Sequence, residues 1–159
     1  MNNELRDNPG VIAPPPLIYT IPLLSGLILH VLYPVQLVRY LPLVVRGFLS
    51  GSLVGFALTF ITIAFRTMRR SNTNIDPAQP TTSLVVEGPF QVTRNPLYLS
   101  MTVFYSGITI LVNTLWTALL LPIILIMMRK GVIDREERYL ERKFGEQYLR
   151  YKASVRRWF

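Results

Sequence analysis

Two adjacent carboxylates near the end of the chain, Glu136 and Glu137, are the residues best placed for ligand chemistry. On a helix drawn over residues 133–155, Glu137 projects inside an apolar stripe, between Leu140 and Tyr148. Glu136 projects onto the flank of that stripe. An inward-facing carboxylate must find a cation, a hydrogen-bond donor or a ligand. A structural ion pair with an arginine and a ligand-binding role explain this position equally well.

Several other kinds of chemistry are excluded by composition. The chain has no cysteine, so it offers no thiolate nucleophile, disulfide or cysteine metal cluster. Its single histidine, His30, lies within an apolar stretch. A lone histidine on such a stretch is more often a packed helix residue than a catalyst. We therefore assign His30 no role and predict no metal site.

A second candidate region is the polar segment 67–94, which ends at Arg94. It is too long and irregular for a simple connection between neighbouring helices, and we interpret it as a binding loop. A short apolar run at 84–86, followed by the turn signal at 87–90, predicts that part of it is ordered and folds back onto the helix ends. Arg94 or Arg129 would be the partner in a structural ion pair with the acidic pair. Arg94 is equally suited to bind an anionic group or to anchor a helix at lipid headgroups.

The elements that must position these residues are apolar and long. Half of the residues are hydrophobic, and three runs carry no formal charge, at 11–38, 47–65 and 95–128. Soluble cores rarely contain such runs. The last would be about 50 Å long as one helix, against a hydrocarbon core of about 30 Å. It should fold back at the polar pair Asn113–Thr114, leaving two short helical arms at 96–112 and 115–128.

These runs predict an all-α fold, a polytopic membrane helical bundle of about four transmembrane helices with a C-terminal amphipathic helix. We expect one membrane domain over residues 1–159. Its parts are a proline-rich leader at 1–16, the first two transmembrane spans at 17–66, a cytoplasmic binding loop at 67–94, a helical hairpin at 95–129 and a cytoplasmic amphipathic tail helix at 130–159.

Orientation follows from the basic residues, which are in excess in cytoplasmic loops. The tail from Arg129 onward holds ten of the seventeen Lys and Arg residues. An even number of spans therefore predicts that both termini are cytoplasmic, and the composition fits a bacterial cytoplasmic membrane. The net charge of +8 is explained by anionic headgroups, so no nucleic-acid partner is expected.

Gly47, Gly51 and Gly55 recur every four residues in the second span and form a small-residue face. We interpret this face as packing within the bundle. A homodimer through the same face is the weaker hypothesis.

An ordered set of short motifs in the second half of the chain resembles the isoprenylcysteine carboxyl methyltransferase and phospholipid methyltransferase superfamily. The resemblance covers about residues 73–156. It rests on Gly88-Pro89-Phe90, Arg94-Asn95-Pro96-Leu97-Tyr98, Glu136-Glu137, Leu140, Phe144-Gly145, Tyr148 and Tyr151.

The resemblance implies an integral membrane methyltransferase that uses S-adenosylmethionine and acts on a small lipid-like or isoprenoid acceptor. It implies Arg94 and Glu137 as catalytic residues. The implied cofactor-binding residues are Thr82, Ser83, Leu84, Val85, Phe90, Asn95, Pro96, Leu97, Tyr98, Glu136 and Glu137. Asn95 departs from the pattern, because the better-known eukaryotic members carry histidine there, although an amide also donates and accepts hydrogen bonds.

Two other functions stay open. Sterol and steroid reductases share a related membrane core, which makes an NADPH-dependent membrane reductase the first alternative. The departure at Asn95 permits the second, a membrane scaffold without turnover. Cofactor binding distinguishes the three hypotheses.

Overall fold

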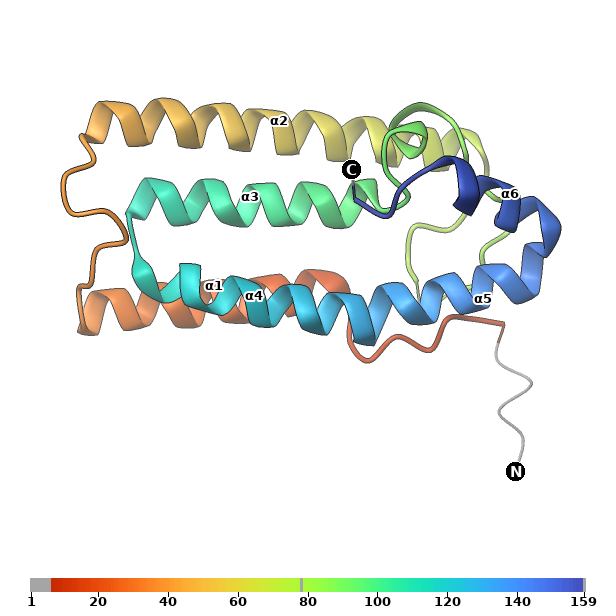
Figure 1. The fold of residues 1–159 in the computed structure, drawn as a ribbon, viewed down its shortest axis with the longest axis horizontal. Coiled ribbons are helices and arrows are strands. Elements are labelled where there is room, and N and C mark those ends of the chain that lie inside the picture. Colours follow the sequence, from red (N-terminus) through yellow and green to blue (C-terminus); the bar gives the residue numbers. More distant parts are fainter. Residues whose placement is uncertain (1–6, 78, 159) are drawn as a thin grey trace.

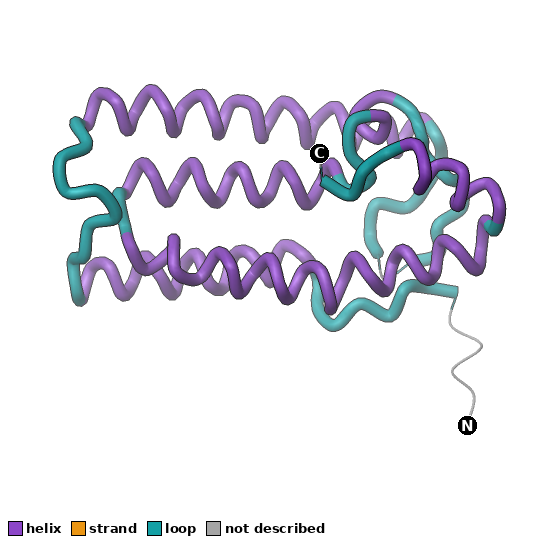
Figure 2. The backbone as a smooth tube through the Cα atoms, in the orientation of Figure 1, coloured by secondary structure: helices purple, strands orange, loops and turns teal. Residues whose placement is uncertain are grey.

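The computed structural model describes residues 7–77 and 79–158, and four apolar helices form its body (Figure 1). They are α1 (Pro15–Leu32), α2 (Leu43–Arg70), α3 (Pro96–Val112) and α4 (Leu115–Met128). A π-helical turn, η2 (Arg129–Ile133), joins α4 to α5 (Asp134–Phe144), and α6 (Glu146–Ser154) follows. The loop between α2 and α3 contains the 3₁₀ turn η1 (Gly88–Gln91). Figure 2 shows helices and loops alone over the described residues.

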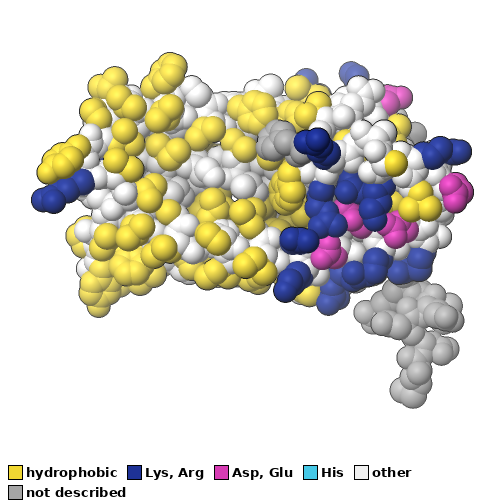
Figure 3. Space-filling model, in the orientation of Figure 1, with side chains coloured by type: hydrophobic (Ala, Val, Ile, Leu, Met, Phe, Trp, Pro, Cys, Tyr) yellow, Lys and Arg dark blue, Asp and Glu magenta, His cyan; other side chains and the backbone are white. Residues whose placement is uncertain are grey.

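Three helical stretches are long and apolar enough to cross a membrane, namely α1, α2 and the continuous helix Leu115–Phe144. The 17 residues of α3 form a shorter apolar helix beside them. Figure 3 shows hydrophobic side chains over the body of the bundle and most of the charged ones gathered at the end that holds α5 and α6. The predicted all-α membrane bundle of about four helices is confirmed. We call the end with α5 and α6 the charged end.

Two helix pairs make up the bundle, with α2 packed against α3 and α1 against α4. The close approaches use two glycines outside the predicted small-residue face. A Cβ on Gly107 would lie 2.9 Å from Val54 Cγ2, and one on Gly26 would lie 2.6 Å from Thr117 Cγ2.

By contrast, a Cβ on Gly47, Gly51 or Gly55 would meet nothing within 4 Å. The interpretation that these glycines pack within the bundle is therefore wrong. The four-residue spacing defines a face of α2 correctly, but it contains no information about which neighbour that face meets.

The predicted fold-back at Asn113 and Thr114 is confirmed. Asn113 adopts the left-handed conformation, with φ of 57°, and so ends α3. Its side chain accepts a hydrogen bond from Val38 N at 2.9 Å and donates one to Val38 O at 2.8 Å. The hairpin is thereby tied to the loop between α1 and α2 at the end of the bundle opposite the charged end (Figure 1).

The predicted tail helix over 133–155 is wrong in two respects. First, α4 does not stop at Arg129, because its backbone continues through η2 into α5 as one helix. Second, the helix breaks at Gly145, where φ of 50° and ψ of −128° suit glycine. After this break α6 turns back toward the bundle, and Tyr151 Oη donates a hydrogen bond to Phe90 O at 2.7 Å.

The described part of the leader is tied to η2 and α5. Ile12 N donates to Gly131 O at 3.2 Å, and a Cβ on Gly131 would lie 2.2 Å from Ile12 Cδ1. Arg135 Nη1 donates to Gly10 O at 2.7 Å. The isoleucine side chain thus occupies a notch that exists because residue 131 has no side chain.

Candidate functional site

A pocket at the charged end is bounded by the loop after α2, the first turn of α3, and the two helices α5 and α6. We call it the charged-end pocket. The loop contributes Thr73, Ser83, Leu84, Val85 and Phe90, among others. The start of α3 contributes 95–98, directly after Arg94. The helices α5 and α6 contribute Glu136, Glu137, Tyr139, Leu140, Tyr148 and Tyr151.

Almost all of the residues predicted to form the site therefore lie together. Thr82 is the exception, because it is exposed and its hydroxyl donates to Asn72 O instead. Ser83 does line the pocket, but its hydroxyl donates to Ser71 O at 2.5 Å. Whether the lining residues hold a cofactor stays a prediction.

Glu137 is the buried centre of an ion-pair cluster. Its two carboxylate oxygens accept hydrogen bonds from Arg157 Nε at 2.9 Å and from Arg157 Nη2 at 2.7 Å. Arg94 Nη2 lies 3.3 Å from Glu137 Oε1, and Lys152 Nζ lies 3.9 Å from Glu137 Oε2. The ion pair with Arg94 expected as one alternative is therefore present, and Glu137 has cationic partners in the chain itself.

Glu136 has a different environment from its neighbour. It is half-buried in the wall of the pocket and accepts a hydrogen bond from Tyr98 Oη at 2.5 Å. Among the described residues no Lys or Arg forms an ion pair with Glu136, in contrast to Glu137. The Tyr98 backbone is held in turn from α1, where Tyr19 Oη donates to Tyr98 O at 3.4 Å. Of the two carboxylates, Glu136 retains more capacity to accept hydrogen bonds from a ligand.

Asn95 is buried, and its amide group is used within the chain. Asn95 Nδ2 donates to Arg157 O at 3.0 Å, and Thr93 Oγ1 donates to the same oxygen at 2.9 Å. Arg94 N donates to Arg156 O at 3.1 Å. The C-terminal segment therefore lies along the residues that precede α3 and brings the Arg157 side chain to Glu137.

Two tyrosines on α6 form part of the wall. Burial raises the pKa of Tyr148 to about 12, and burial also raises the pKa of Tyr151. Both phenols therefore stay protonated near neutral pH, and Tyr151 Oη uses its proton in the hydrogen bond to Phe90 O. Their rings contact each other edge to face at 6.2 Å between centroids.

Thr73 and Tyr139 belong to the site but were not predicted from the sequence. Thr73 is 7% exposed, and its hydroxyl has no hydrogen-bond partner among the described residues. Tyr139 Oη accepts from Thr81 N at 3.1 Å and bonds to Asp7 Oδ1 at 2.8 Å, which connects loop, helix and leader. Neither residue had a signal in the sequence, because Tyr139 projects about 120° from Ile133, outside the apolar stripe of the helix drawn over 133–155, and the loop around Thr73 has no periodic pattern.

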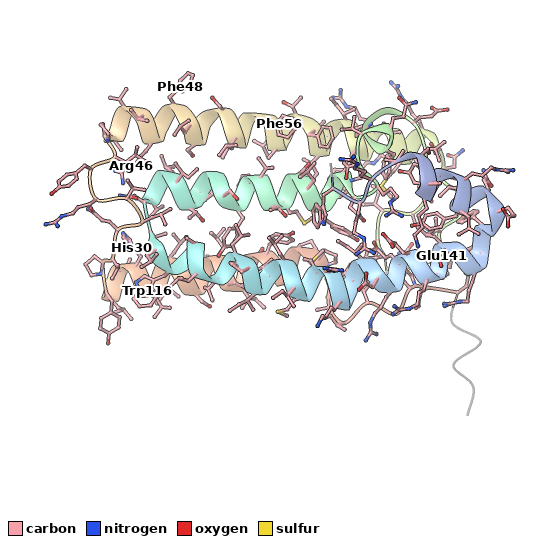
Figure 4. All side chains as sticks on the ribbon, in the orientation of Figure 1. His30, Arg46, Phe48, Phe56, Trp116 and Glu141 are labelled. Atoms are coloured by element: carbon pink, nitrogen blue, oxygen red, sulfur yellow. The ribbon has the colours of Figure 1, made fainter. Side chains whose placement is uncertain are left out.

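The opposite end of the bundle has a separate set of polar side chains. His30 and Trp116 lie there, far from Glu141 at the charged end (Figure 4). Trp116 Nε1 donates to Tyr33 O at 2.7 Å, which ties α4 to the end of α1. Over residues 7–77 and 79–158, no group of three or more His, Asp or Glu side chains is arranged to hold a metal ion.

The sequence that forms this site matches a known protein family. The model of the phospholipid methyltransferase family matches residues 45–147, which span α2, the loop, α3, α4 and α5. The chain is also similar to an uncharacterized protein of Haemophilus influenzae, with 39% identity over 62 residues. That match covers 39% of this chain and 98% of the relative. No solved structure matches the chain.

Proposed function

The chain belongs to the phospholipid methyltransferase family, and we propose that it transfers a methyl group from S-adenosylmethionine to a small lipid-like or isoprenoid acceptor at the cytoplasmic membrane face. One observation carries the proposal beyond family membership. The loop, the start of α3 and the acidic pair on α5 meet in one pocket, although Tyr98 and Glu136 are 38 residues apart in the sequence.

The pocket offers groups of the kinds that S-adenosylmethionine needs. Leu84, Val85 and Phe90 give an apolar wall suited to the adenine ring. The carboxylate of Glu136 suits ribose hydroxyls or the amino group, which are donors. The unpartnered hydroxyl of Thr73 supports this fit, because a buried polar group in a pocket wall is satisfied when a ligand bonds to it.

The bound cofactor would supply a methyl group already activated by its positively charged sulfur. The protein's own residues then have to bind, orient and exclude water. In this proposal Glu136 binds the ligand directly. Glu137 holds Arg94 and Arg157 in place, and with Arg94 it forms the catalytic pair implied by the family.

The membrane setting supports separate entry routes for the cofactor and for the acceptor. A water-soluble cofactor would enter at the charged end, and an apolar acceptor would arrive from the bilayer along the hydrophobic body of the bundle. The basic residues at the charged end favour placing it, with both termini, in the cytoplasm. A bacterial cytoplasmic membrane is part of the same proposal.

The first test is a titration of the purified chain with S-adenosylhomocysteine and, separately, with NADPH. We expect saturable binding of S-adenosylhomocysteine and none of NADPH, whereas the opposite pattern would favour a reductase and refute the proposal. Glu136→Gln should weaken S-adenosylhomocysteine binding by about 10-fold or more. Glu141→Gln is the matched control, because Glu141 pairs with Lys152 and does not line the pocket.

A homodimer through Gly47, Gly51 and Gly55 is a separate proposal. It is supported by the open space in front of this face in the single chain. Gly51→Leu should leave the fold intact and lower the detergent-corrected mass from dimer to monomer. An unchanged mass for a folded variant would rule out this interface.

A further inference from the structure

The guanidinium group of Arg94 is only partly paired within the chain. Its side chain is 10% exposed and lines the charged-end pocket. Nη2 lies 3.3 Å from Glu137 Oε1, and the guanidinium also interacts with the Tyr148 hydroxyl, but Nε and Nη1 are buried without a well-aligned hydrogen-bond partner among the described residues. A buried guanidinium with unused N–H groups is unfavourable unless something accepts from them.

Glu137 does not meet this demand, because it is shared. Arg157 already binds both of its oxygens, and Lys152 Nζ lies 3.9 Å from one of them. Arg157 reaches Asp134 as well, at 3.0 Å, but Arg94 forms no ion pair with a second carboxylate within residues 7–77 and 79–158. The Glu137 carboxylate therefore faces three cations. Of the two arginines, Arg94 makes the longer contact with it, 3.3 Å against 2.7 Å for Arg157.

The backbone around Arg94 adds to the positive potential. Arg94 lies two residues before Pro96, the first residue of α3, and the first residues of α3 line the same pocket. The N-terminus of a helix carries partial positive charge and favours anions. The helix end and the unpartnered side chain are independent observations, and both indicate negative charge on a ligand.

We propose that the unpaired N–H groups of Arg94 form a subsite for an oxyanion, either a carboxylate or a phosphate, of the ligand that fills the charged-end pocket. Glu136 stands in the wall of the same pocket, and although burial raises the pKa of this carboxyl to about 7, a cationic group beside it favours the ionised form. The pocket is thereby suited to a zwitterion, with its oxyanion toward Arg94 and its ammonium group toward Glu136.

This inference rests on the proposed function, which supplies two sources of such an oxyanion. One is the carboxylate in the amino-acid part of the cofactor. The other is the phosphate of a lipid headgroup acceptor. The chemistry of recognition is the same for both, and the experiment separates them.

The experiment compares the wild-type chain with Arg94→Gln in detergent. Calorimetry measures the affinity for S-adenosylhomocysteine and for 5′-methylthioadenosine, which lacks both the carboxylate and the amino group. Thermal unfolding measures stabilisation by inorganic phosphate relative to chloride at equal ionic strength. Arg142→Gln, on the exposed surface of α5, is the control for loss of one positive charge.

If the cofactor supplies the oxyanion, Arg94→Gln weakens S-adenosylhomocysteine binding by about 10-fold or more and leaves 5′-methylthioadenosine binding unchanged. If a headgroup supplies it, S-adenosylhomocysteine binding is unchanged and the stabilisation by phosphate disappears. Arg142→Gln should change neither. The subsite is refuted if Arg94→Gln matches the wild type in both measurements.

The proposed function and the oxyanion subsite at Arg94 can be refuted separately. A wild-type chain that binds no S-adenosylhomocysteine but is stabilised by phosphate through Arg94 refutes the proposed function and keeps the subsite. If Arg94→Gln does not fold, the ligand affinities and the phosphate stabilisation of the wild type alone test the subsite. Equal affinity for S-adenosylhomocysteine and 5′-methylthioadenosine, with no stabilisation by phosphate, then overturns the subsite.

Discussion

Replacing Glu137 by glutamine tests the view that this carboxylate holds the charged end together. The change keeps the shape of the side chain and removes the charge that Arg94, Arg157 and Lys152 share. Arg94 is then left 10% exposed without its counter-ion. Breaking a buried ion pair by removing one partner costs about 3–5 kcal/mol.

The exposure of the partner cations places the expected loss of folding free energy at the lower end of that range. The side chains of Arg157 and Lys152 are 25% and 38% exposed, so both regain solvation when the charge is removed. We therefore expect about 3 kcal/mol of destabilisation. For a chain of this size it corresponds to a fall of about 6–12 °C in the unfolding midpoint.

The assay is thermal unfolding in detergent, followed by circular dichroism, without added ligand. Glu141→Gln is the control, because Glu141 pairs with the partly exposed Lys152 and should contribute about 0–1 kcal/mol. A midpoint for Glu137→Gln within 2 °C of the wild type, or equal falls for both variants, would refute the reasoning about the cluster.

Three further predictions concern the leader and the hairpin. Gly131→Ala should cost about 1–3 kcal/mol in the same assay and increase proteolysis of the leader, because the new methyl group would lie 2.2 Å from Ile12 Cδ1. The hydrogen bond from Lys143 lowers the pKa of Asp7 from its ordinary value of 3.8. The contact between Asp7 and Lys143 is therefore kept above pH 4 and lost as the pH falls through the lowered pKa. Hydrogen exchange of the leader amides should accelerate only below about pH 4. Asn113→Ala should cost about 1–3 kcal/mol, since it removes two hydrogen bonds to the α1–α2 loop from a residue with φ of 57°.

Much of the fold is predictable from the sequence, because lipid imposes a strong constraint on it. A charge-free run longer than the hydrocarbon core must turn, and the polar pair Asn113–Thr114 marked where it does. The same reasoning failed at Arg129. A cluster of charges marks where an apolar surface ends, but the helical backbone is free to continue beyond it, as it does through η2 into α5.

The break at Gly145 was missed for a related reason. Projection at a fixed angle per residue continues an apolar stripe through a glycine without registering a change in backbone direction. The residues after the break still face the pocket, because α6 folds back onto Phe90. The stripe was thus a correct indication of burial and a wrong indication of a single helix.

The candidate site was predictable where its residues belong to the motifs, and not elsewhere. Arg157 lies outside those motifs, and its contact with Glu137 depends on how the C-terminal segment lies against Thr93 and Asn95. Thr73 lies in a loop whose sequence gives no sign of a partnerless hydroxyl. Such contacts depend on the three-dimensional path of the chain and have no periodic pattern in the sequence.

That the charged-end pocket carries out methyl transfer is tested most directly with the purified chain in lipid nanodiscs. The chain is incubated with S-adenosylmethionine labelled in its methyl group, together with a bacterial lipid and isoprenoid extract. We predict that label enters the organic phase with the wild type and with Glu141→Gln, and that Glu136→Gln lowers the rate by about 10-fold or more. Transfer that is unaffected by Glu136→Gln would contradict the assignment of the reaction to this pocket. A folded wild-type chain that transfers no label to any fraction would contradict the proposed activity.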